Sequence, residues 1–316
     1  MKDLKKYIYL SLLFLFNFIV LSNCVVFSSQ RMQNSNANCY YKNAYNSEKK
    51  LEKNAISSKK DHNIVKNFKN IRKNENIYSK SQTYKMAIVI DDFGSFDQSG
   101  VKTLLNCGVP LTCAVIPNVD NTNSNISEIT KKGHELILHM PMQAHVNLPE
   151  SWYGPIYIKT YDTPETVYEK LNRCLKNFPK INGFNIHIGS GVSKNKELMK
   201  VIYTYAKEHN FYFLDSRTII TNATEEACKE TNSIYLGRDV FLEADKNKSY
   251  AGVCYRLTEG ANIAKQKGYS IVIGHVGAEG GENTSKAICD SLDKIKNMGV
   301  EIVPLSEIYQ MLKEKQ

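Results

Sequence analysis

The eight cysteines of this 316-residue chain do not form a single C-x-x-C pair. Six of them are dispersed at wide spacings through residues 86–316, unlike the dense disulfide framework of a small secreted domain. A domain of this size buries a core of its own, so we expect most of these cysteines to act as small buried hydrophobic residues. An isolated disulfide bridge stays open at this point.

Residues 86–316 also lack net positive charge. Residues 1–85 contain 16 lysines and arginines and 5 acidic residues, a net charge of +11, so residues 86–316 carry −2 of the total of +9. This balance disfavours a nucleic-acid interface in the larger part of the chain. A basic segment near a membrane favours anionic headgroups or an anionic wall polymer, although a solvated linker is the simpler explanation.

Residues 27–85 lack any periodic pattern of apolar side chains. Asparagine, lysine and serine dominate there, which predicts a disordered spacer. The preceding residues 1–26 begin with lysines and continue into an apolar stretch from Tyr7 to Leu21, as in a secretory signal. An uncleaved membrane anchor and a lipoprotein signal ending at Cys24 are the alternatives. We therefore expect export to the cell envelope or the extracellular space, with membrane contact through this segment.

Short apolar runs alternate with amphipathic stretches from residue 86 onward. The runs expected to be strands are 86–91, 109–116, 134–140, 181–188, 211–215, 233–236, 270–275 and 300–303. The expected helices lie near 97–107, 123–132, 164–178, 194–209, 222–231, 250–267, 282–297 and 305–315. Four glycines would end helices in the left-handed conformation: Gly108, Gly133, Gly268 and Gly299.

Strict alternation of strands and helices predicts an α/β fold with a parallel sheet covered by helices. Seven or eight mostly parallel strands in residues 86–316 fit a distorted (β/α) barrel, and a doubly wound open sheet is the competing topology. Both architectures place chemistry at the C-terminal ends of the strands, so the search for a site does not depend on this choice.

Two adjacent carboxylates, Asp91 and Asp92, end the first apolar run and precede Phe93 and Gly94. Side chains of consecutive strand residues point in opposite directions, so the two acids would serve different roles. A turn of the chain beyond the strand would let one bind a metal and the other contact a reacting water. The alternative is a pair of acids that caps the following helix.

Histidines end three later apolar runs: His139, His187 and His275. A single histidine at the end of an apolar strand is more often a core residue than a ligand. Three at equivalent positions, together with the acid pair, indicate one site at a shared edge of the sheet. Two neutral imidazoles and one carboxylate would leave an open coordination position on Zn²⁺, as in catalytic zinc sites.

The order of these motifs resembles the divergent polysaccharide deacetylases, distant relatives of the NodB-type carbohydrate esterases. The matching stretches cover nearly all of residues 86–310 in family order: 88–94, 115–118, 133–142, 185–190, 213–218, 238–242 and 273–275. The resemblance implies a distorted barrel with seven or eight strands and a divalent metal, most often zinc.

Carried over from the family, Asp92 would bind the metal together with His139 and His187. Asp91 would be the general base that takes a proton from the water attacking an N- or O-acetyl carbonyl. His275 matches the late histidine of the family and would protonate the leaving amine or alkoxide.

Further roles concern the acids and arginines of the later strands. Asp215 or Asp239 would orient His275 and raise its pKa. Arg217 and Arg238 would contact the substrate or pair with these acids or with Asp91, and a structural ion pair is an equal alternative.

The loop after the third strand holds a group of aromatic residues. Trp152, Tyr153, Tyr157 and Tyr161 would overhang the mouth of the site and stack on sugar faces, with core packing as an equal alternative. His145 is spaced from His139 like the paired histidines of NodB-type enzymes and is an alternative ligand to His187, although an ordinary loop histidine explains it as well.

The resulting interpretation is a metal-dependent hydrolase, with Zn²⁺ the preferred cofactor, that removes acetyl groups from a cell-envelope polysaccharide or glycan. A metallo-amidase acting on wall peptides would use the same activation of water. A non-catalytic glycan-binding protein is a third hypothesis. Retention of five chemically matched residues argues against a pure binder: Asp91, Asp92, His139, His187 and His275.

Overall fold

The computed structural model describes residues 83–244 and 248–315. The expected signal segment (1–26) and nearly all of the expected spacer (27–85) lie outside these residues. The described part starts just before residue 86, where the folded domain was expected to begin. None of the helices within it is long and apolar enough to cross a membrane.

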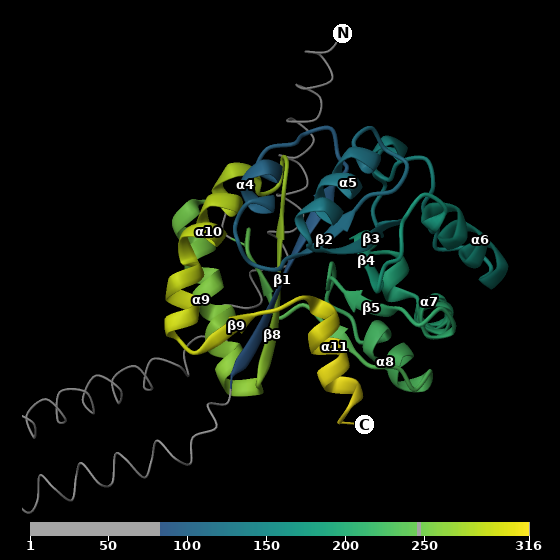
Figure 1. Cartoon of the computed structure of the whole chain (residues 1–316). Helices are drawn as coiled ribbons and strands as arrows, with labels where there is room; N and C mark the ends of the chain where they lie inside the picture. Colours follow the sequence, from purple (N-terminus) through teal and green to yellow (C-terminus); the bar gives the residue numbers. More distant parts are fainter. Residues whose placement is uncertain (1–82, 245–247, 316) are drawn as a thin grey trace, which may run out of the picture. The chain divides into compact units, whose positions relative to one another are not determined.

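The described residues form one nine-stranded sheet in which every paired strand is parallel to its neighbour. The order is β6-β5-β4-β3-β2-β1-β8-β7, and β9 pairs with β1. Helices alternate with the strands and cover the curled sheet (Figure 1), which confirms the expected distorted (β/α) barrel. The strands are β1 (Tyr84–Phe93), β2 (Thr112–Val115), β3 (Glu135–Met142), β4 (Gly183–Ile188), β5 (Tyr212–Asp215), β6 (Leu236–Gly237), β7 (Val240–Phe241), β8 (Tyr269–His275) and β9 (Val300–Ile302).

The helices follow the expected positions closely. Figure 1 shows α9 and α10 side by side along one flank of the sheet and α6, α7 and α8 along another. The four glycines expected at helix ends all have positive φ, as a left-handed cap requires. The helices are α4 (Val101–Leu105), α5 (Thr122–Lys132), α6 (Pro164–Leu175), α7 (Lys196–Glu208), α8 (Ala223–Glu230), α9 (Tyr250–Lys267), α10 (Gly281–Asn297) and α11 (Leu305–Lys313), with short 3₁₀ turns η2 (Glu150–Trp152) and η3 (Val192–Lys194).

Alternation along the strands divides the apolar residues into an outer and an inner core. On β1, Met86, Ile88 and Ile90 belong to the cluster beneath the helices, whereas Ala87 and Val89 belong to the cluster inside the barrel. This division follows from the two-residue period of a strand, whose successive side chains point to opposite faces. The central strands β1, β2, β3 and β8 are therefore buried on both faces, as their almost continuous apolar runs require.

Helix α11 packs against the inner core. Its residues Leu305 and Ile308 are fully buried within that cluster. Burial of each such side chain contributes about 1.5–3 kcal/mol of hydrophobic stabilisation. The last helix of the chain thus fills the inside of the barrel and leaves the C-terminal ends of the strands for a site.

A two-residue connection joins the two outermost strands of the sheet. β6 pairs with β5, β7 pairs with β8, and only Arg238 and Asp239 separate them in the chain. The amide of Arg238 donates to the carbonyl of Asp215 (3.1 Å), and the amide of Asp239 donates to that of Ile271 (2.8 Å). We call residues 238–239 the seam. The sequence analysis expected a single strand here and did not predict β7.

One disulfide bridge connects distant parts of the chain. Cys107, just after α4, is bonded to Cys289 on α10, and their Cα atoms lie 5.3 Å apart. Three of the other cysteines in the described part are buried thiols, as expected: Cys113, Cys174 and Cys228. Cys254 is a half-buried thiol.

Candidate metal centre

Four of the expected site residues point into the barrel at the C-terminal ends of their strands. On β1, β3 and β8, the rows of inner-core residues end in Asp91, His139 and His275. On β4, His187 follows Ile186, which belongs to the outer core, so His187 faces inward. The strand period therefore brings these side chains together from four different strands.

Asp92 joins the same site because the chain turns after Asp91. Its φ is 69°, in the left-handed region that non-glycine residues rarely adopt. The pairing of β1 with β2 shifts register between Ile90 and Phe93, which marks an irregularity at the acid pair. Both carboxylates therefore reach the site, and the helix-capping alternative is wrong because α4 begins after Gly100 instead.

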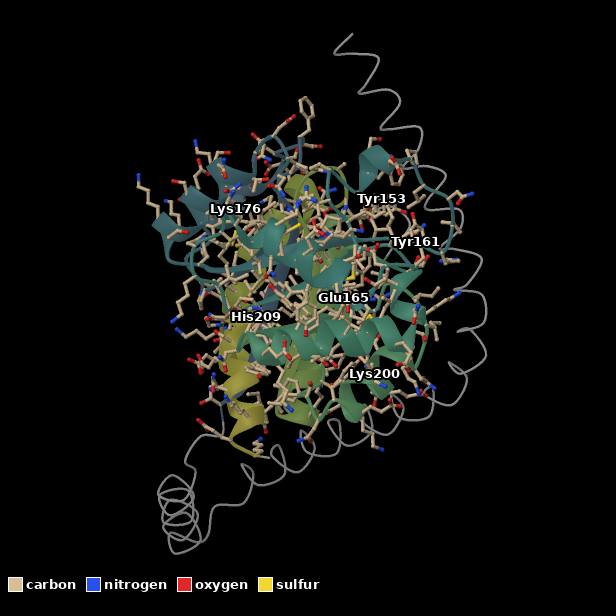
Figure 2. All side chains as sticks on the ribbon, turned by 90° about the vertical axis from the view of Figure 1, so that its right-hand side faces the viewer. Tyr153, Tyr161, Glu165, Lys176, Lys200 and His209 are labelled. Carbon is tan, nitrogen blue, oxygen red and sulfur yellow. A yellow bond between two sulfur atoms is a disulfide. The ribbon has the colours of Figure 1, made fainter. Side chains whose placement is uncertain are left out.

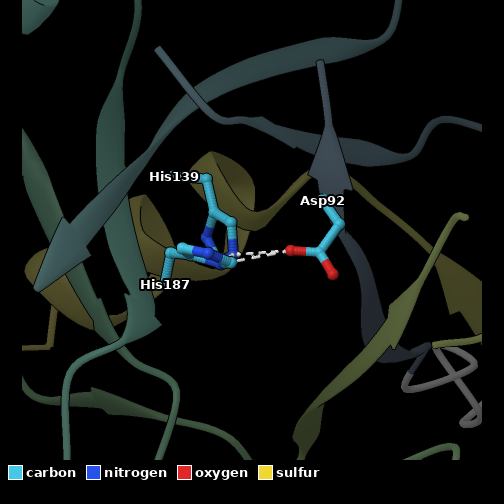
Figure 3. A group of neighbouring side chains, drawn as sticks. All are labelled: Asp92, His139 and His187. Carbon is cyan, nitrogen blue, oxygen red and sulfur yellow. Dashed lines mark hydrogen bonds and ion pairs between the residues drawn. The ribbon is translucent and has the colours of Figure 1, made fainter. Parts of the chain in front are cut away.

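Asp92, His139 and His187 form a compact triad (Figure 3). Oδ1 of Asp92 lies 3.3 Å from Nε2 of His139 and 3.2 Å from Nδ1 of His187. The two imidazole nitrogens lie 3.2 Å apart. Three potential ligand atoms are therefore mutual neighbours at the centre of the site.

Asn185 fixes the orientation of His139. Its Nδ2 donates to Oδ1 of Asp91 at 2.8 Å, and because a carboxylate only accepts, the amide oxygen must face the histidine. That oxygen lies 2.7 Å from Nδ1 of His139, which therefore carries the hydrogen. In the neutral imidazole, Nε2 then presents its lone pair to the centre of the triad.

A backbone carbonyl fixes His187 in the same way. Nε2 of His187 lies 3.2 Å from the carbonyl oxygen of Trp152 in η2, which can only accept a hydrogen bond. Nδ1 of the neutral ring then has its lone pair directed at Asp92 and His139. This outward hydrogen bond to a carbonyl is the arrangement that orients metal-binding histidines in general.

The triad fits a divalent metal with tetrahedral coordination. Zn²⁺ lies about 2.0–2.1 Å from nitrogen and oxygen ligands, so two ligands on a tetrahedron are separated by about 3.3–3.4 Å. The observed separations of 3.2–3.3 Å agree with this value. Three lone pairs at such distances repel one another unless a cation lies between them, so the donor set itself favours metal binding.

The electrostatics of the triad favour positive charge. Burial alone would raise the pKa of Asp92, but His139 and His187, when protonated, donate to its carboxylate and hold this pKa well below the usual value. Burial alone would lower the pKa of His139, yet its attraction to Asp91 and its hydrogen bond with Asp92 raise it. The negative charge that favours a proton on this imidazole also favours a divalent cation.

Asp91 lies next to the triad in a different environment. Its side chain is 2% exposed, and this burial raises the pKa of its carboxyl above the usual value. The attraction of His139 and His275 and the hydrogen bond from Asn185 oppose the effect of burial. A carboxylate with a raised pKa is a better proton acceptor than one fully stabilised by hydrogen bonds.

His275 is oriented by Glu243, not by the aspartates that the sequence suggested. Nδ1 of His275 lies 3.1 Å from Oε2 of Glu243, whose Oε1 accepts from the amide of His275 (2.9 Å) and from Oγ1 of Thr284 (2.7 Å). Burial alone would lower the pKa of His275, but Glu243 outweighs it and, with Asp92 and Asp91, raises the pKa to about 10.

The expectation that Asp215 or Asp239 orients His275 is therefore wrong. Asp215 has the strand parity of Phe213, which lies in the outer core, and its carboxylate accepts from the amide of Arg217 (2.8 Å) and the hydroxyl of Tyr235 (2.9 Å). Asp239 forms an ion pair with Lys267 at 2.8 Å. Neither carboxylate is free to accept from the imidazole.

Arg217 and Arg238 lie at the ends of β5 and β6, on the rim that carries the site. Their side chains donate to backbone carbonyls and to the hydroxyl of Tyr235. The structural ion pair considered from the sequence is absent: among residues 83–244 and 248–315, neither guanidinium forms an ion pair with a carboxylate.

The aromatic loop divides into a buried and an exposed part. Tyr153 is 3% exposed, stacks on Tyr157 with ring centroids 4.4 Å apart, and accepts from the amide of Ala144. Tyr161 is 72% exposed. Figure 2 shows Tyr153 and Tyr161 near each other on one side of the molecule. Core packing therefore accounts for Tyr153, whereas Tyr161 is available to a ligand.

His145 lies apart from the triad. It is exposed, and its Nδ1 lies 2.9 Å from the hydroxyl of Ser190. The structure thus places His187, and not His145, beside His139 and Asp92.

Two polar residues of the site, Asn185 and Glu243, had no role in the sequence analysis. Asn185 lies two positions before His187, so strand alternation places both on the same face and was a usable signal. Glu243 directly follows the 238–242 stretch that was recognised. Its role depends on the path of the chain beyond β7, which no periodic pattern revealed.

Comparisons with known proteins identify the family of this chain. A profile of the divergent polysaccharide deacetylase family matches residues 88–309. The uncharacterized protein YibQ of Escherichia coli K12 is 28% identical over 195 residues, which cover 60% of this chain and 58% of YibQ. An uncharacterized protein of Haemophilus influenzae Rd is 28% identical over 191 residues, 60% of this chain and 66% of that protein. The chain thus matches less than two thirds of the length of either relative.

A solved structure with a similar fold comes from Agrobacterium tumefaciens C58. This uncharacterized protein superposes with a TM-score of 0.64 and 18% sequence identity, covering 73% of this chain and 91% of its own. At this level of identity the similarity concerns the fold alone.

Proposed function

Because the chain belongs to the divergent polysaccharide deacetylase family, we propose that it is a metal-dependent hydrolase that removes acetyl groups from a cell-envelope polysaccharide or glycan. The observation that carries this proposal is the triad of Asp92, His139 and His187, whose ligand atoms lie 3.2–3.3 Å apart. Asp91 and His275, the proposed base and acid, are paired neighbours on β1 and β8 next to it.

The residues around the triad suit acyl transfer to water. Asp91, whose pKa is raised by burial, would accept a proton from the attacking water. His275, held protonated by Glu243, would donate a proton to the leaving amine or alkoxide. A divalent metal held by Asp92, His139 and His187 would supply Lewis acidity toward the acetyl carbonyl and lower the pKa of water.

Asp91 and His275 are neighbours in different environments, which suit one to be the base and the other the acid. Burial raises the pKa of the Asp91 carboxyl, which makes it a better proton acceptor, whereas Glu243 raises the pKa of His275 to about 10 and favours its protonated form. Such separation of two titratable groups is the usual basis for assigning a base and an acid in one site.

The Cys107–Cys289 disulfide supports the proposed export. Structural disulfides persist in oxidising compartments such as the bacterial periplasm and the extracellular space. We therefore propose that the catalytic part works in the cell envelope or outside the cell. The membrane contact expected from residues 1–26 is part of the same proposal.

The experiment that tests the function combines metal analysis with an activity assay on the full-length chain. Elemental analysis is expected to find about one divalent metal ion per chain, and acetylated glycan fragments are expected to release acetate. His139→Ala should lose both. Failure to bind any metal after addition of zinc at neutral pH would overturn the proposal. Cleavage of wall peptides without release of acetate would favour the metallo-amidase instead.

A further inference from the structure

Arg217 and Arg238 hold each other in place beside the candidate metal centre. Nη1 of Arg217 donates to the carbonyl of Arg238 (3.2 Å), and Nη2 of Arg238 donates to the carbonyl of Arg217 (2.9 Å). Nε of Arg238 donates to the carbonyl of Ser216 at 2.7 Å. Nε of Arg217 lies 3.3 Å from the hydroxyl of Tyr235. The two guanidinium groups are thus fixed by neutral acceptors.

Neither guanidinium of this pair lies within ion-pair distance of a carboxylate in the described part of the chain. Asp215 attracts both arginines, and Asp91 and Glu243 attract Arg238. The carboxylate of Asp215 accepts from the Arg217 amide and the Tyr235 hydroxyl instead. Burial lowers the pKa of Arg238 to about 10, and the charge of Arg217 adds to that effect. Two like charges fixed side by side repel each other, and a bound anion would offset this repulsion.

The backbone at Arg217 is itself strained. Its φ is 49°, in the left-handed region, and the amide is held there by Asp215. Such strain costs about 1–3 kcal/mol and persists where the surroundings enforce it, often at ligand sites. Arg217 is nevertheless exposed, so its guanidinium is accessible to a ligand while its backbone is fixed.

A single aromatic ring links the arginine pair to His275. The guanidinium of Arg238 lies 5.1 Å from the ring centroid of Phe241, and the imidazole of His275 lies 5.2 Å from the same ring. Because His275 would protonate the group that leaves from the acetyl carbon, the leaving sugar would lie against this part of the rim. The arginines are therefore placed to meet a substituent of that sugar.

We propose that Arg217 and Arg238 form an anion-binding subsite, so that the substrate is a glycan whose sugars carry a carboxylate or phosphate group. Each guanidinium retains N–H groups that are not used by the backbone, and its planar fork matches either anion. The assignment of the substrate to the leaving-group side rests on the proposed deacetylase function, whereas anion binding itself does not.

The first test measures binding without catalysis. Isothermal titration calorimetry of the full-length chain would compare glucuronic acid and glucose 6-phosphate with glucose. The two anionic sugars are expected to bind more tightly than glucose, and Arg217→Ala should weaken them by about 10-fold or more, the usual effect of losing a charged hydrogen bond. Preference for one anion identifies whether the substituent is a carboxylate or a phosphate.

Arg256→Ala is the matched control, because Arg256 is paired with Glu259 on α9. It should leave the binding of all three sugars unchanged. Equal binding of glucose and the anionic sugars, or equal losses in the Arg217 and Arg256 variants, would overturn the inference. Arg238→Gln provides a second variant that keeps a planar donor and removes the charge.

The second test separates this inference from the proposed function. For acetylated glycans with and without an anionic substituent, the ratio of their kcat/KM values should fall about 10-fold in Arg217→Ala. Acetate release with an unchanged ratio would refute the subsite and leave the deacetylase standing. Arginine-dependent binding of anionic sugars without acetate release from any glycan would retain the subsite and refute the deacetylase.

Discussion

At the C-terminal ends of the strands, the two sides of the candidate site have opposite hydrogen-bonding character. The acceptor side, Asp92, His139 and His187 on β1, β3 and β4, turns three lone pairs toward one another. The donor side, His275, Arg217 and Arg238 near β5–β8, presents N–H groups and positive charge. Acceptors gathered this closely need a cation, and donors need an anion or developing negative charge. A reaction in which charge builds up on a leaving group between the two sides suits this division.

Each side depends on one buried polar residue whose role the sequence pattern does not predict. Asn185 is fully buried and orients His139, while also donating to Asp91. Glu243 is 3% exposed and orients His275. The difference between an amide and a carboxylate matters, because only the carboxylate adds a negative charge that stabilises a protonated imidazole.

Removal of an acceptor-side ligand should have the largest effect. In His139→Ala, two of the three ligand atoms remain, and catalysis of acetate release should fall by about 1000-fold or more because metal affinity is lost. Elemental analysis should show loss of the metal while circular dichroism shows a folded chain. His145→Ala is the matched control, and retention of metal by His139→Ala would contradict the assignment.

Replacement of the proposed acid should impair catalysis without affecting metal binding on the acceptor side. His275→Ala is expected to lower kcat by about 100-fold or more, because a positioned proton donor contributes that much. The metal content should equal that of the unmodified protein. If metal is lost as well, His275 belongs to the acceptor side, and the division of the rim is wrong.

Asn185 contacts both a proposed metal ligand, His139, and the proposed base, Asp91. In Asn185→Ala, His139 loses its orienting acceptor, so metal affinity should fall by about 10- to 100-fold. Loss of the hydrogen bond to Asp91 also removes an influence that lowers the pKa of this base. Because the base works only when deprotonated, the acidic limb of the kcat/KM profile should move to higher pH.

A competition assay with a zinc chelator measures the first effect of Asn185→Ala, and a pH–rate profile measures the second. Asn182→Ala is the control, since Asn182 is a surface residue that donates to Glu135. Unchanged affinity together with an unchanged profile would show that Asn185 acts only in packing.

The smallest expected change concerns Glu243. In Glu243→Gln the carboxylate that raises the pKa of His275 is gone, so this pKa should fall. The acid works only when protonated, and its activity is lost as pH rises through its pKa. The alkaline limb should therefore move to lower pH by about one unit or more. Glu259→Gln should leave the limb in place, and a limb that also stays in place in Glu243→Gln would exclude His275 as the acid.

The strands and most of the site follow from short-range regularities of the sequence. Alternation along β1, β3 and β8 predicts that Asp91, His139 and His275 continue the inner-core rows. The same rule, applied to Asp215, would have placed it with Phe213 on the outer face, so the error there came from neglecting parity. The contribution of Asp92 could not be read in this way, because it depends on a left-handed φ at a non-glycine residue.

The later part of the barrel was less predictable for a physical reason. β6 and β7 contain two residues each, too few for a period to be recognised, so the sequence pattern does not reveal their pairing with β5 and β8. The roles of Glu243 and Arg238 depend on that pairing. The disulfide was equally hidden, because Cys107 and Cys289 are 182 residues apart in sequence.

The seam at residues 238–239 also implies which part of the site is lost first. β1 to β4 are consecutive in the sheet, whereas the seam is bonded to Asp215 on β5 and to Ile271 on β8. Local unfolding begins where few contacts must break, and β6 and β7, which flank the seam, contain only two residues each. Opening there would leave Asp92, His139 and His187 in place on β1, β3 and β4 but would release the segment that carries Glu243, which orients His275. Hydrogen exchange should therefore be faster at the amides of Arg238 and Asp239 than in β3, and the opened form would keep the three proposed metal ligands together while the proposed acid loses its orienting carboxylate.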